Sequence, residues 1–196
     1  IVVDDFSQDK TREILQRDLK DKIQKIILND KNYGKGYSIK KGIEKTSGDC
    51  ILIQDADLEY DPKEHVRLIK PIIDGKADVV YGSRFTGYGE SRSLLFWHRM
   101  GNFVLTHFCN ILTNLNLSDM ETCYKAIKSS YFKKLNIREN RFGIEPEITI
   151  KLAKKKFKFY EVAVSYRGRS YSEGKKITLK DAFWAVFCIL RYRFFD

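Results

Sequence analysis

The acidic residues Asp55, Asp57 and Glu59 follow almost directly on a short apolar run, residues 50–53. Such a run is typical of a buried strand, so these carboxylates are expected where a strand ends. Like charges this close repel one another, which favours a cation between them. Hard oxygen ligands suit Mg²⁺ or Mn²⁺, which commonly take further ligands from substrate phosphates. The stretch predicts a metal site beside a phosphate-bearing substrate. Judged without the rest of the chain, a polar turn after a core strand is an equally good interpretation.

Several apolar runs alternate with helical patterns in the first part of the chain. The expected strands cover residues 1–3, 23–28, 50–53 and 78–81. This alternation predicts an α/β domain with a mainly parallel sheet flanked by helices. Ligands of such sheets bind beyond the carboxyl ends of the strands. Asp5, Asp57 and Arg84 each follow one of these runs, so we expect them to share one site.

A glycine loop at residues 32–36 contains Lys35 and opens a helix. It lacks the spacing of a phosphate-binding P-loop, so a tight turn with free helix-terminus amides is the favoured interpretation. Lys35 is counted among the candidate substrate-binding residues. A second loop, residues 167–176, mixes basic residues with glycine and serine. A flexible basic loop of this kind would make a lid over a diphosphate.

The second half of the chain departs from strict alternation. Its expected elements are an amphipathic stretch at 94–117, a short strand after residue 124, a helix ending at 154–156, an edge strand within 157–166 and a final helix. We divide the chain into a main domain, residues 1–176, and a C-terminal amphipathic helix, residues 177–196. The latter is a candidate for contact with a membrane surface.

The chain has 196 residues and a net charge of +10, from 36 basic and 26 acidic residues. This charge favours an anionic partner, such as a phosphorylated small molecule, an acidic membrane or nucleic acid. Nucleic acid is the weakest candidate, because the acidic residues at the sheet edge would repel its phosphates. The four cysteines are far apart and form no C-x-x-C pair. They are interpreted as reduced cysteines of a cytoplasmic protein.

A series of segments carries a resemblance that no single motif carries alone. In chain order they are VVDDFSQDKT, GKGYSIKKGI, DCILIQDADLEYDP, VVYGSRF, ETCYKAIKSSYF, RFGIEPEITIKLAKK and YEVAVSYRGRSYSEGKKI. Together they resemble family 2 glycosyltransferases, and most closely the polyprenyl-phosphate type, the dolichyl-phosphate mannosyltransferase-like enzymes. The resemblance implies a GT-A (Rossmann-like) fold, a GDP- or UDP-sugar donor and a divalent metal.

The resemblance also implies roles for individual residues. Asp55 and Asp57 match the D-x-D pair, and Asp57 is the expected direct metal ligand. Asp5 would lie near the base or ribose of the nucleotide. The basic residues expected to face the donor diphosphate or the acceptor phosphate are Arg84, Arg169 and Lys175.

Two departures from the family pattern bear on these expectations. The family's first strand and its Pro-x-x-Asn-Glu loop would precede Ile1, so the sheet is expected to lack its N-terminal strand. Glu59 stands where relatives often have Gln, and it could be a third metal ligand or a neighbour of the ligands.

The expected reaction moves a sugar from a nucleoside diphosphate to a polyprenyl phosphate, with Asp57 and Arg84 in catalytic roles. Metal and basic side chains would stabilise the leaving diphosphate. A phosphate acceptor needs no strong base, but Glu145 is the candidate base for a hydroxyl acceptor. The alternatives are a sugar-phosphate nucleotidyltransferase and a non-catalytic nucleic-acid-binding module.

A lipid acceptor would bring the protein to the cytoplasmic face of a membrane. Residues 94–117 and 182–190 combine aromatic and apolar side chains with neighbouring basic residues, a pattern that favours the membrane interface. Neither segment is apolar over the length that a membrane-spanning helix needs. Peripheral attachment is therefore expected, and packing of both helices in the core is the alternative.

Overall fold

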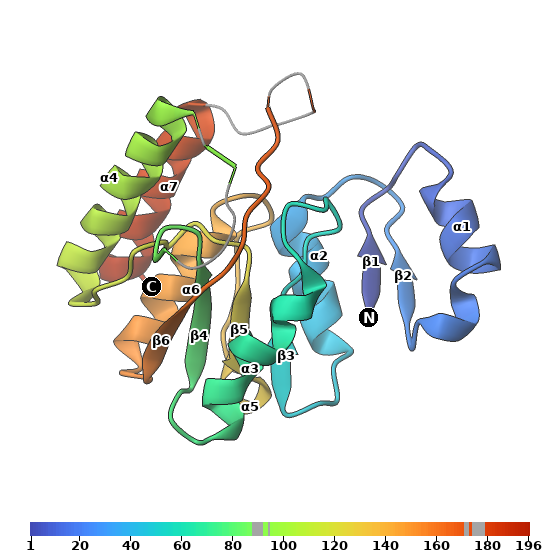
Figure 1. Ribbon diagram of the computed structural model, residues 1–196, viewed down its shortest axis with the longest axis horizontal. Coiled ribbons are helices and arrows are strands. Elements are labelled where there is room, and N and C mark those ends of the chain that lie inside the picture. The colour runs from blue at the N-terminus through green and yellow to red at the C-terminus, as the bar shows by residue number, and fades with distance from the viewer. Residues whose placement is uncertain (88–91, 94, 171–172, 174–178) are drawn as a thin grey trace.

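The computed structural model describes residues 1–87, 92–93, 95–170, 173 and 179–196 (Figure 1). Its larger sheet has four strands in the order β3-β5-β4-β6. The bounds of these strands are Cys50–Leu52 for β3, Val79–Ser83 for β4, Lys125–Lys128 for β5 and Phe159–Ala163 for β6. Strand β5 runs antiparallel to β3 and β4, whereas β4 and β6 are parallel. The sheet is therefore mixed, with β3, β4 and β6 pointing the same way, and the expected α/β class is confirmed.

The reversal of β5 follows from the path of the chain after β4. Helix α4 (Phe96–Thr113) is one continuous helix that ends at Asn114, whose backbone is left-handed with φ of 57°. The chain then returns through residues 115–124 and enters β5 from the end at which it left β4. This segment consequently lies at the carboxyl ends of β3 and β4, where a ligand site is expected.

A separate two-stranded parallel sheet is formed by β1 (Val2–Asp4) and β2 (Ile26–Leu28). Helix α1 (Thr11–Arg17) connects these strands. Helix α2 (Lys35–Glu44) packs on both sheets, because its Gly42 lies against Val3 and its Ile43 belongs to the same core cluster as Ile51 of β3. Figure 1 shows the small sheet to the side of β3, with α2 in the adjoining layer.

Helix α3 (His65–Ile73) covers one face of the larger sheet, where Leu68 and Ile72 are buried. Asp61 accepts a hydrogen bond from the Lys63 amide at 2.9 Å and caps the preceding turn, as an Asp-Pro helix start predicts. A proline inside a helix kinks or ends it, and α3 ends at Ile73, two residues after Pro71.

The opposite face is covered by α6 (Ile144–Lys154) and by α5 (Ser129–Phe132). Glu145 lies in the first turn of α6. Helix α7 (Leu179–Phe194) packs against α4 and α6, where Cys188, Ile189 and Tyr192 are buried. The division into residues 1–176 and 177–196 remains a prediction.

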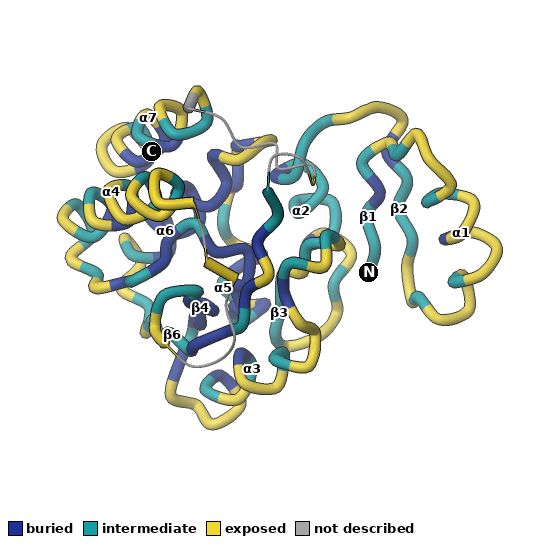
Figure 2. The backbone as a smooth tube through the Cα atoms, turned by 45° about the horizontal axis from the view of Figure 1, so that its top comes forward, coloured by how far each residue is buried: buried dark blue, intermediate teal, exposed yellow. Residues whose placement is uncertain are grey.

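The outer sides of α4 and α7 leave many apolar side chains in solvent, as the exposed stretches of both helices in Figure 2 show. Trp97 is 79% exposed and Phe183 is 77% exposed. Within the described residues, no helix combines the length and the apolar character needed to cross a membrane.

Candidate active site

The D-x-D turn follows β3 at its carboxyl end. The Ile53 amide still donates to the Lys125 carbonyl, after which the chain leaves the sheet. Leu58 takes a left-handed backbone conformation with φ of 61° and is 89% exposed. The Glu59 amide donates to the Asp57 carboxylate at 3.2 Å, which closes the turn. The expected position of these carboxylates is therefore correct, and each of them has a basic partner.

Asp55 is paired with Lys35, whose ammonium lies 2.8 Å from an Asp55 oxygen and 2.8 Å from a Glu145 oxygen. Lys35 and Glu145 are both largely buried, with side chains 19% and 7% exposed. Burial opposes ionisation of Lys35, but the two carboxylates outweigh it and raise the pKa of Lys35 well above its usual value. Burial likewise opposes ionisation of Asp55, but Lys35 lowers the pKa of Asp55. Lys35 is thus held between two carboxylates in this structure, and its expected contact with a substrate stays a prediction.

The glycines around Lys35 explain this placement. Gly34 has φ of 100°, and a Cβ atom at Gly36 would collide with the Glu139 carbonyl oxygen. The Tyr37 amide donates to the Asn140 carbonyl at 3.1 Å, so the start of α2 rests on the segment before α6. Only glycine permits this approach of backbone to backbone. The loop is a tight turn, as expected, and it brings Lys35 to Glu145.

Arg169 is the cationic partner of Asp57 and Glu59. Its guanidinium donates to Asp57 at 2.9 Å and to Glu59 at 3.0 Å, and its backbone amide also donates to Glu59 at 3.0 Å. The Tyr166 hydroxyl donates to the second Glu59 oxygen at 2.9 Å. Burial and the neighbouring carboxylates Glu59 and Asp55 raise the pKa of Asp57, although Arg169 opposes them. The start of the basic loop is therefore folded onto the acidic turn, while Lys175 lies outside the described residues.

Arg84 forms an ion pair with Asp119, a residue that no motif in the sequence marks as part of the site. The guanidinium donates to Asp119 at 2.6 and 2.7 Å, and the carboxylate is completely buried. The Asn102 side chain donates to the same carboxylate at 3.0 Å. Burial alone would raise the pKa of Asp119, but Arg84 outweighs it and lowers that pKa. Arg84 lies at the expected edge, directly after β4, and Asp119 compensates its charge inside the protein.

Asp5 supports the glycine loop rather than standing free. Its carboxylate accepts hydrogen bonds from the amides of Tyr33 at 3.0 Å and Gly34 at 2.6 Å, and from the Asn29 side chain at 2.8 Å. Asp5 therefore fixes the position of the turn that carries Lys35. Its expected contact with a nucleotide stays a prediction.

A buried group of charges lies behind the acidic turn. Lys125 is 1% exposed, and its ammonium donates to the carbonyl oxygens of Met120, at 3.0 Å, and Thr122. Among the described residues, one oxygen of Glu121 and one of Glu145 are buried without a hydrogen-bond donor. Burial and the charge of Glu145 raise the pKa of Glu121 to about 8. The surroundings of Glu121 thus favour its neutral, protonated form.

Replacing Glu121 by Gln is expected to flatten the pH dependence of stability. The folded pKa of Glu121, about 8, lies above the ordinary value of 4.5, so the folded state binds the proton more tightly. The contribution of Glu121 to stability is therefore full below about pH 4.5 and is lost as the pH rises toward and past 8. Urea unfolding of the wild type should show that the free energy of unfolding decreases over this pH range. The Glu121→Gln variant should show a smaller decrease. Equal slopes for the two proteins between pH 5 and 9 would contradict the assignment.

The donor set of the turn suits a hard divalent cation, because Asp55 and Asp57 offer carboxylate oxygens only. Glu59 is bound to Tyr166 and Arg169, and no group of three or more His, Cys, Asp or Glu side chains within the described part of the chain could hold a metal. Any metal held by Asp55 and Asp57 would therefore need further ligands from water or from a bound phosphate. The structure does not bring the three predicted ligands, Asp55, Asp57 and Glu59, together as a ready site.

The model of the family described as glycosyl transferase family 2 matches residues 1–136, which include the D-x-D turn, Arg84 and Glu121. The chain belongs to glycosyl transferase family 2. The resemblance stated from the sequence segments is thereby confirmed.

Among curated family 2 relatives, the dolichol-phosphate mannosyltransferase of Pyrococcus furiosus is 27% identical over 183 residues, which are 90% of this chain and 51% of that protein. The undecaprenyl-phosphate 4-deoxy-4-formamido-L-arabinose transferase of Edwardsiella ictaluri is 26% identical over 178 residues, 89% of this chain and 52% of that protein. An uncharacterised protein of Methanocaldococcus jannaschii is 30% identical over 90% of this chain and 82% of its own length. The chain thus spans about half the length of these two named transferases.

The fold is shared with glucosyl-3-phosphoglycerate synthase from Mycobacterium tuberculosis. A crystal structure of that enzyme with Mn²⁺, uridine diphosphate and phosphoglyceric acid matches all of this chain and 67% of its own, with a TM-score of 0.73 and 15% identity. Another was determined with Mg²⁺ and uridine diphosphate, with a TM-score of 0.71 and 17% identity over 98% of this chain and 67% of its own. The expected GT-A fold is confirmed.

Proposed function

We propose that this protein transfers a sugar from a nucleoside-diphosphate sugar to a polyprenyl phosphate in a reaction that depends on Mg²⁺ or Mn²⁺. The observation that carries the proposal is the acidic D-x-D turn at the carboxyl end of β3, with Arg169 lying directly against Asp57. The names of the lipid-phosphate transferases among its relatives support the acceptor class. The ions and nucleotides in the glucosyl-3-phosphoglycerate synthase structures support the donor and cofactor classes.

Asp57 and Asp55 would hold the metal, which supplies positive charge to the leaving diphosphate. Lys35 keeps Asp55 ionised and oriented, because it ties that carboxylate to Glu145. The guanidinium of Arg169 neutralises the negative charges of Asp57 and Glu59 in this structure. The Arg169 side chain is 38% exposed to solvent. In the proposed reaction Arg169 moves its hydrogen bonds from Asp57 to a substrate phosphate, where it stabilises the charge that develops on the diphosphate.

The surroundings of Glu145 favour a phosphate acceptor. One Glu145 oxygen is bound to Lys35 and the other is buried away from solvent. A general base must reach the proton that it removes, either directly or through one water molecule. Glu145 is enclosed and ion-paired here, whereas a phosphate acceptor is already anionic and needs no base. We therefore propose that Glu145 acts by positioning Lys35 and Asp55.

Product analysis tests the proposed function. The protein is incubated with Mn²⁺ and a panel of UDP- and GDP-sugars, with short polyprenyl phosphates, free polyprenols and sugar 1-phosphates as alternative acceptors, and products are identified by mass spectrometry. The proposal expects a glycosyl polyprenyl phosphate and a nucleoside diphosphate. In a separate incubation with a sugar 1-phosphate and a nucleoside triphosphate, formation of a nucleotide sugar and pyrophosphate would instead identify a nucleotidyltransferase.

We further propose that the exposed sides of α4 and α7 contact a membrane surface from its cytoplasmic side. Together they expose Phe96, Trp97, Phe103, Ile111, Phe183 and Phe187. Basic side chains on the same helices, Arg99, Lys180, Arg191 and Arg193, would face anionic headgroups. Aromatic residues beside basic ones are typical of interfacial helices. The free thiols of the four cysteines suit a reducing compartment.

Liposome flotation tests this contact. The wild type should float with vesicles rich in anionic lipid, and binding should weaken with salt because exposed charges are screened. Trp97→Ala and Phe183→Ala should each reduce binding several-fold, since each removes a large exposed apolar side chain. Ile73→Ala is the matched control, because Ile73 is 73% exposed but lies on α3. A folded wild type that stays unbound at low salt would contradict the proposal.

A further inference from the structure

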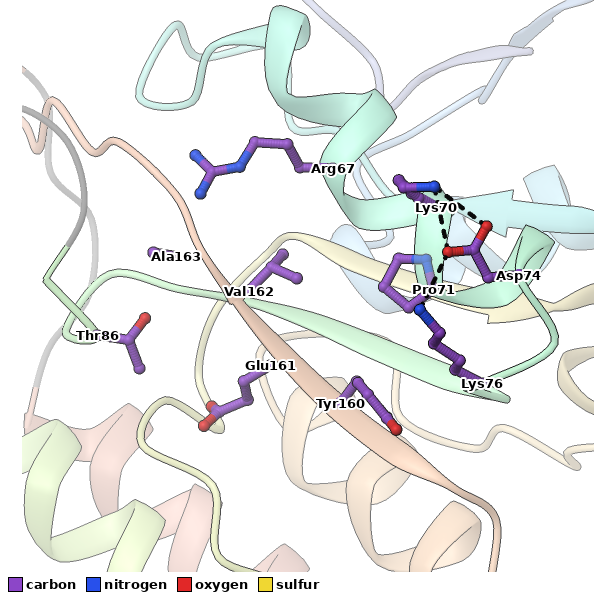
Figure 3. A pocket seen from close by; sticks show the side chains of 10 residues that line it. All are labelled: Arg67, Lys70, Pro71, Asp74, Lys76, Thr86, Tyr160, Glu161, Val162 and Ala163. Atoms are coloured by element: carbon purple, nitrogen blue, oxygen red, sulfur yellow. Dashed lines mark hydrogen bonds and ion pairs between the residues drawn. The ribbon is translucent and has the colours of Figure 1, made fainter.

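Away from the acidic turn, a groove of about 520 Å³ runs between α3 and the edge strand β6 (Figure 3). Arg67, Lys70 and Pro71 of α3 form one wall, and Tyr160 and Val162 of β6 form part of the other. Figure 3 shows Arg67 and the Lys70–Asp74–Lys76 group on the helix side, with the strand crossing below them. Neither the D-x-D turn nor Arg169 lines this groove.

The strand wall of the groove is an edge strand of the larger sheet. Strand β6 is the last strand of its sheet, and none of the described residues forms a strand on its outer side. The Val164 amide donates to the Ser83 carbonyl, and the Val79 amide donates to the Lys158 carbonyl. Even-numbered residues of β6 therefore direct their backbone groups toward β4. Because successive residues of a strand direct their backbone N–H and C=O groups to opposite edges, those of Phe159, Glu161 and Ala163 point away from β4.

The helix wall of the groove is basic. The side chains of Arg67, Lys70 and Lys76 are 50%, 68% and 63% exposed. Asp74 lies between the two lysines, at 3.2 and 3.4 Å from their ammonium groups. The carboxylate of Glu64, 3.7 Å from Arg67, already accepts two hydrogen bonds from the Ser165 amide. The wall therefore carries an excess of positive charge.

We propose that this groove binds an extended acidic segment of a partner protein, which adds as a further strand along the outer edge of β6. The outward backbone groups of β6 would pair with the backbone of the segment, as in other cases of strand addition. Alternate side chains of the segment would lie on the α3 side of the sheet, because Val162 packs in the core cluster of Leu68 and Ile72. Acidic side chains at those positions would meet Arg67, Lys70 and Lys76.

A second copy of the chain fits this edge less well. Antiparallel pairing of two β6 strands would bring two copies of the same basic wall together, and like charges across an interface oppose association. An acidic partner removes this repulsion and gains from the positive charge. The proposal concerns a surface outside the sugar-transfer site and does not depend on the proposed reaction.

The probe for this proposal is a fluorescent seven-residue peptide in which glutamate alternates with valine. Anisotropy should show binding to the wild type at low salt. The charge reversal Arg67→Glu with Lys70→Glu should weaken binding about tenfold or more, because two attractions become repulsions. Lys20→Glu with Lys22→Glu is the matched control, because it reverses the same number of charges on exposed lysines near β2.

Amide hydrogen exchange separates strand addition from simple charge attraction. Bound peptide should slow exchange at the outward amides of Glu161 and Ala163, and the same peptide with every backbone nitrogen methylated should not bind. The proposal is overturned if the peptide does not bind the wild type. It is also overturned if the methylated peptide binds equally well, or if the Glu161 and Ala163 amides exchange unchanged in the complex.

Discussion

Replacing Asp57 by Asn is expected to reduce sugar transfer by about a hundredfold or more, while the folded protein stays at least as stable as the wild type. Transfer falls because the amide removes a charged ligand from the group that would hold the metal, and such electrostatic terms are commonly worth about 3–4 kcal/mol. Stability does not fall, because burial and the carboxylates of Glu59 and Asp55 raise the pKa of Asp57. A raised pKa means that ionised Asp57 disfavours the folded state.

The sign of this stability effect can be checked by measuring the stability of the variant and of the wild type at several pH values. Below the ordinary Asp pKa of 3.8 the wild-type carboxyl is protonated in both states, and Asp57→Asn should match it. Above the raised folded pKa, the variant should be equal or more stable, as measured by thermal unfolding. Asp49→Asn, at the exposed other end of β3, is the control and should leave both transfer and stability unchanged. If the Asp57→Asn variant transfers sugar at the wild-type rate, Asp57 has no role in the reaction.

Replacing Lys35 by Met is expected to destabilise the protein by about 3–5 kcal/mol, because it leaves two carboxylates without their shared cation. Glu145 is 7% exposed and already has one oxygen without a donor. Asp55 would lose its basic partner at 2.8 Å, and its carboxylate would no longer be fixed in the D-x-D turn. Urea unfolding gives the change in stability, and transfer should fall with it under conditions where the variant is folded.

A second substitution distinguishes this ion pair from simple loss of packing. Adding Glu145→Gln to Lys35→Met removes one of the two uncompensated charges, so it should recover part of the lost stability. Lys41→Met is the control, because Lys41 lies on the same helix and its nearest acidic partner, Glu44, is 3.8 Å away and exposed. If the double variant is less stable than Lys35→Met, the Lys35–Glu145 pair does not hold this site together.

The order of apolar runs and polar residues in the sequence predicts which strand ends lie together. Apolar runs followed by Asp55 and Arg84 marked the ends of parallel strands, and these ends do meet at one edge of the sheet. The sequence did not indicate the partners of these residues. Lys35 meets Glu145 across 110 positions because two glycines let α2 start against the Glu139–Asn140 backbone, which a spacing rule cannot foresee.

Asp119 and Glu121 were missed for a topological reason. An alternating α/β pattern implies that each strand runs parallel to its neighbour, and β5 instead enters from the opposite end. That reversal puts the segment before β5 beside the acidic turn, where Asp119 binds Arg84. A hint was present in the sequence, because an Arg that follows a buried strand needs an acidic partner.

The most direct test of the central claim, that Asp57 and Asp55 bind a metal together with a nucleoside diphosphate, is electron paramagnetic resonance of Mn²⁺ titrated with the protein. Arg169 and Lys35 compensate these carboxylates in the structure. Weak binding of Mn²⁺ alone is therefore expected, with binding at least about tenfold tighter when UDP or GDP supplies further ligands, and loss of that gain in Asp57→Asn. Mn²⁺ affinity that is unchanged by the nucleoside diphosphate and by Asp57→Asn would contradict the account.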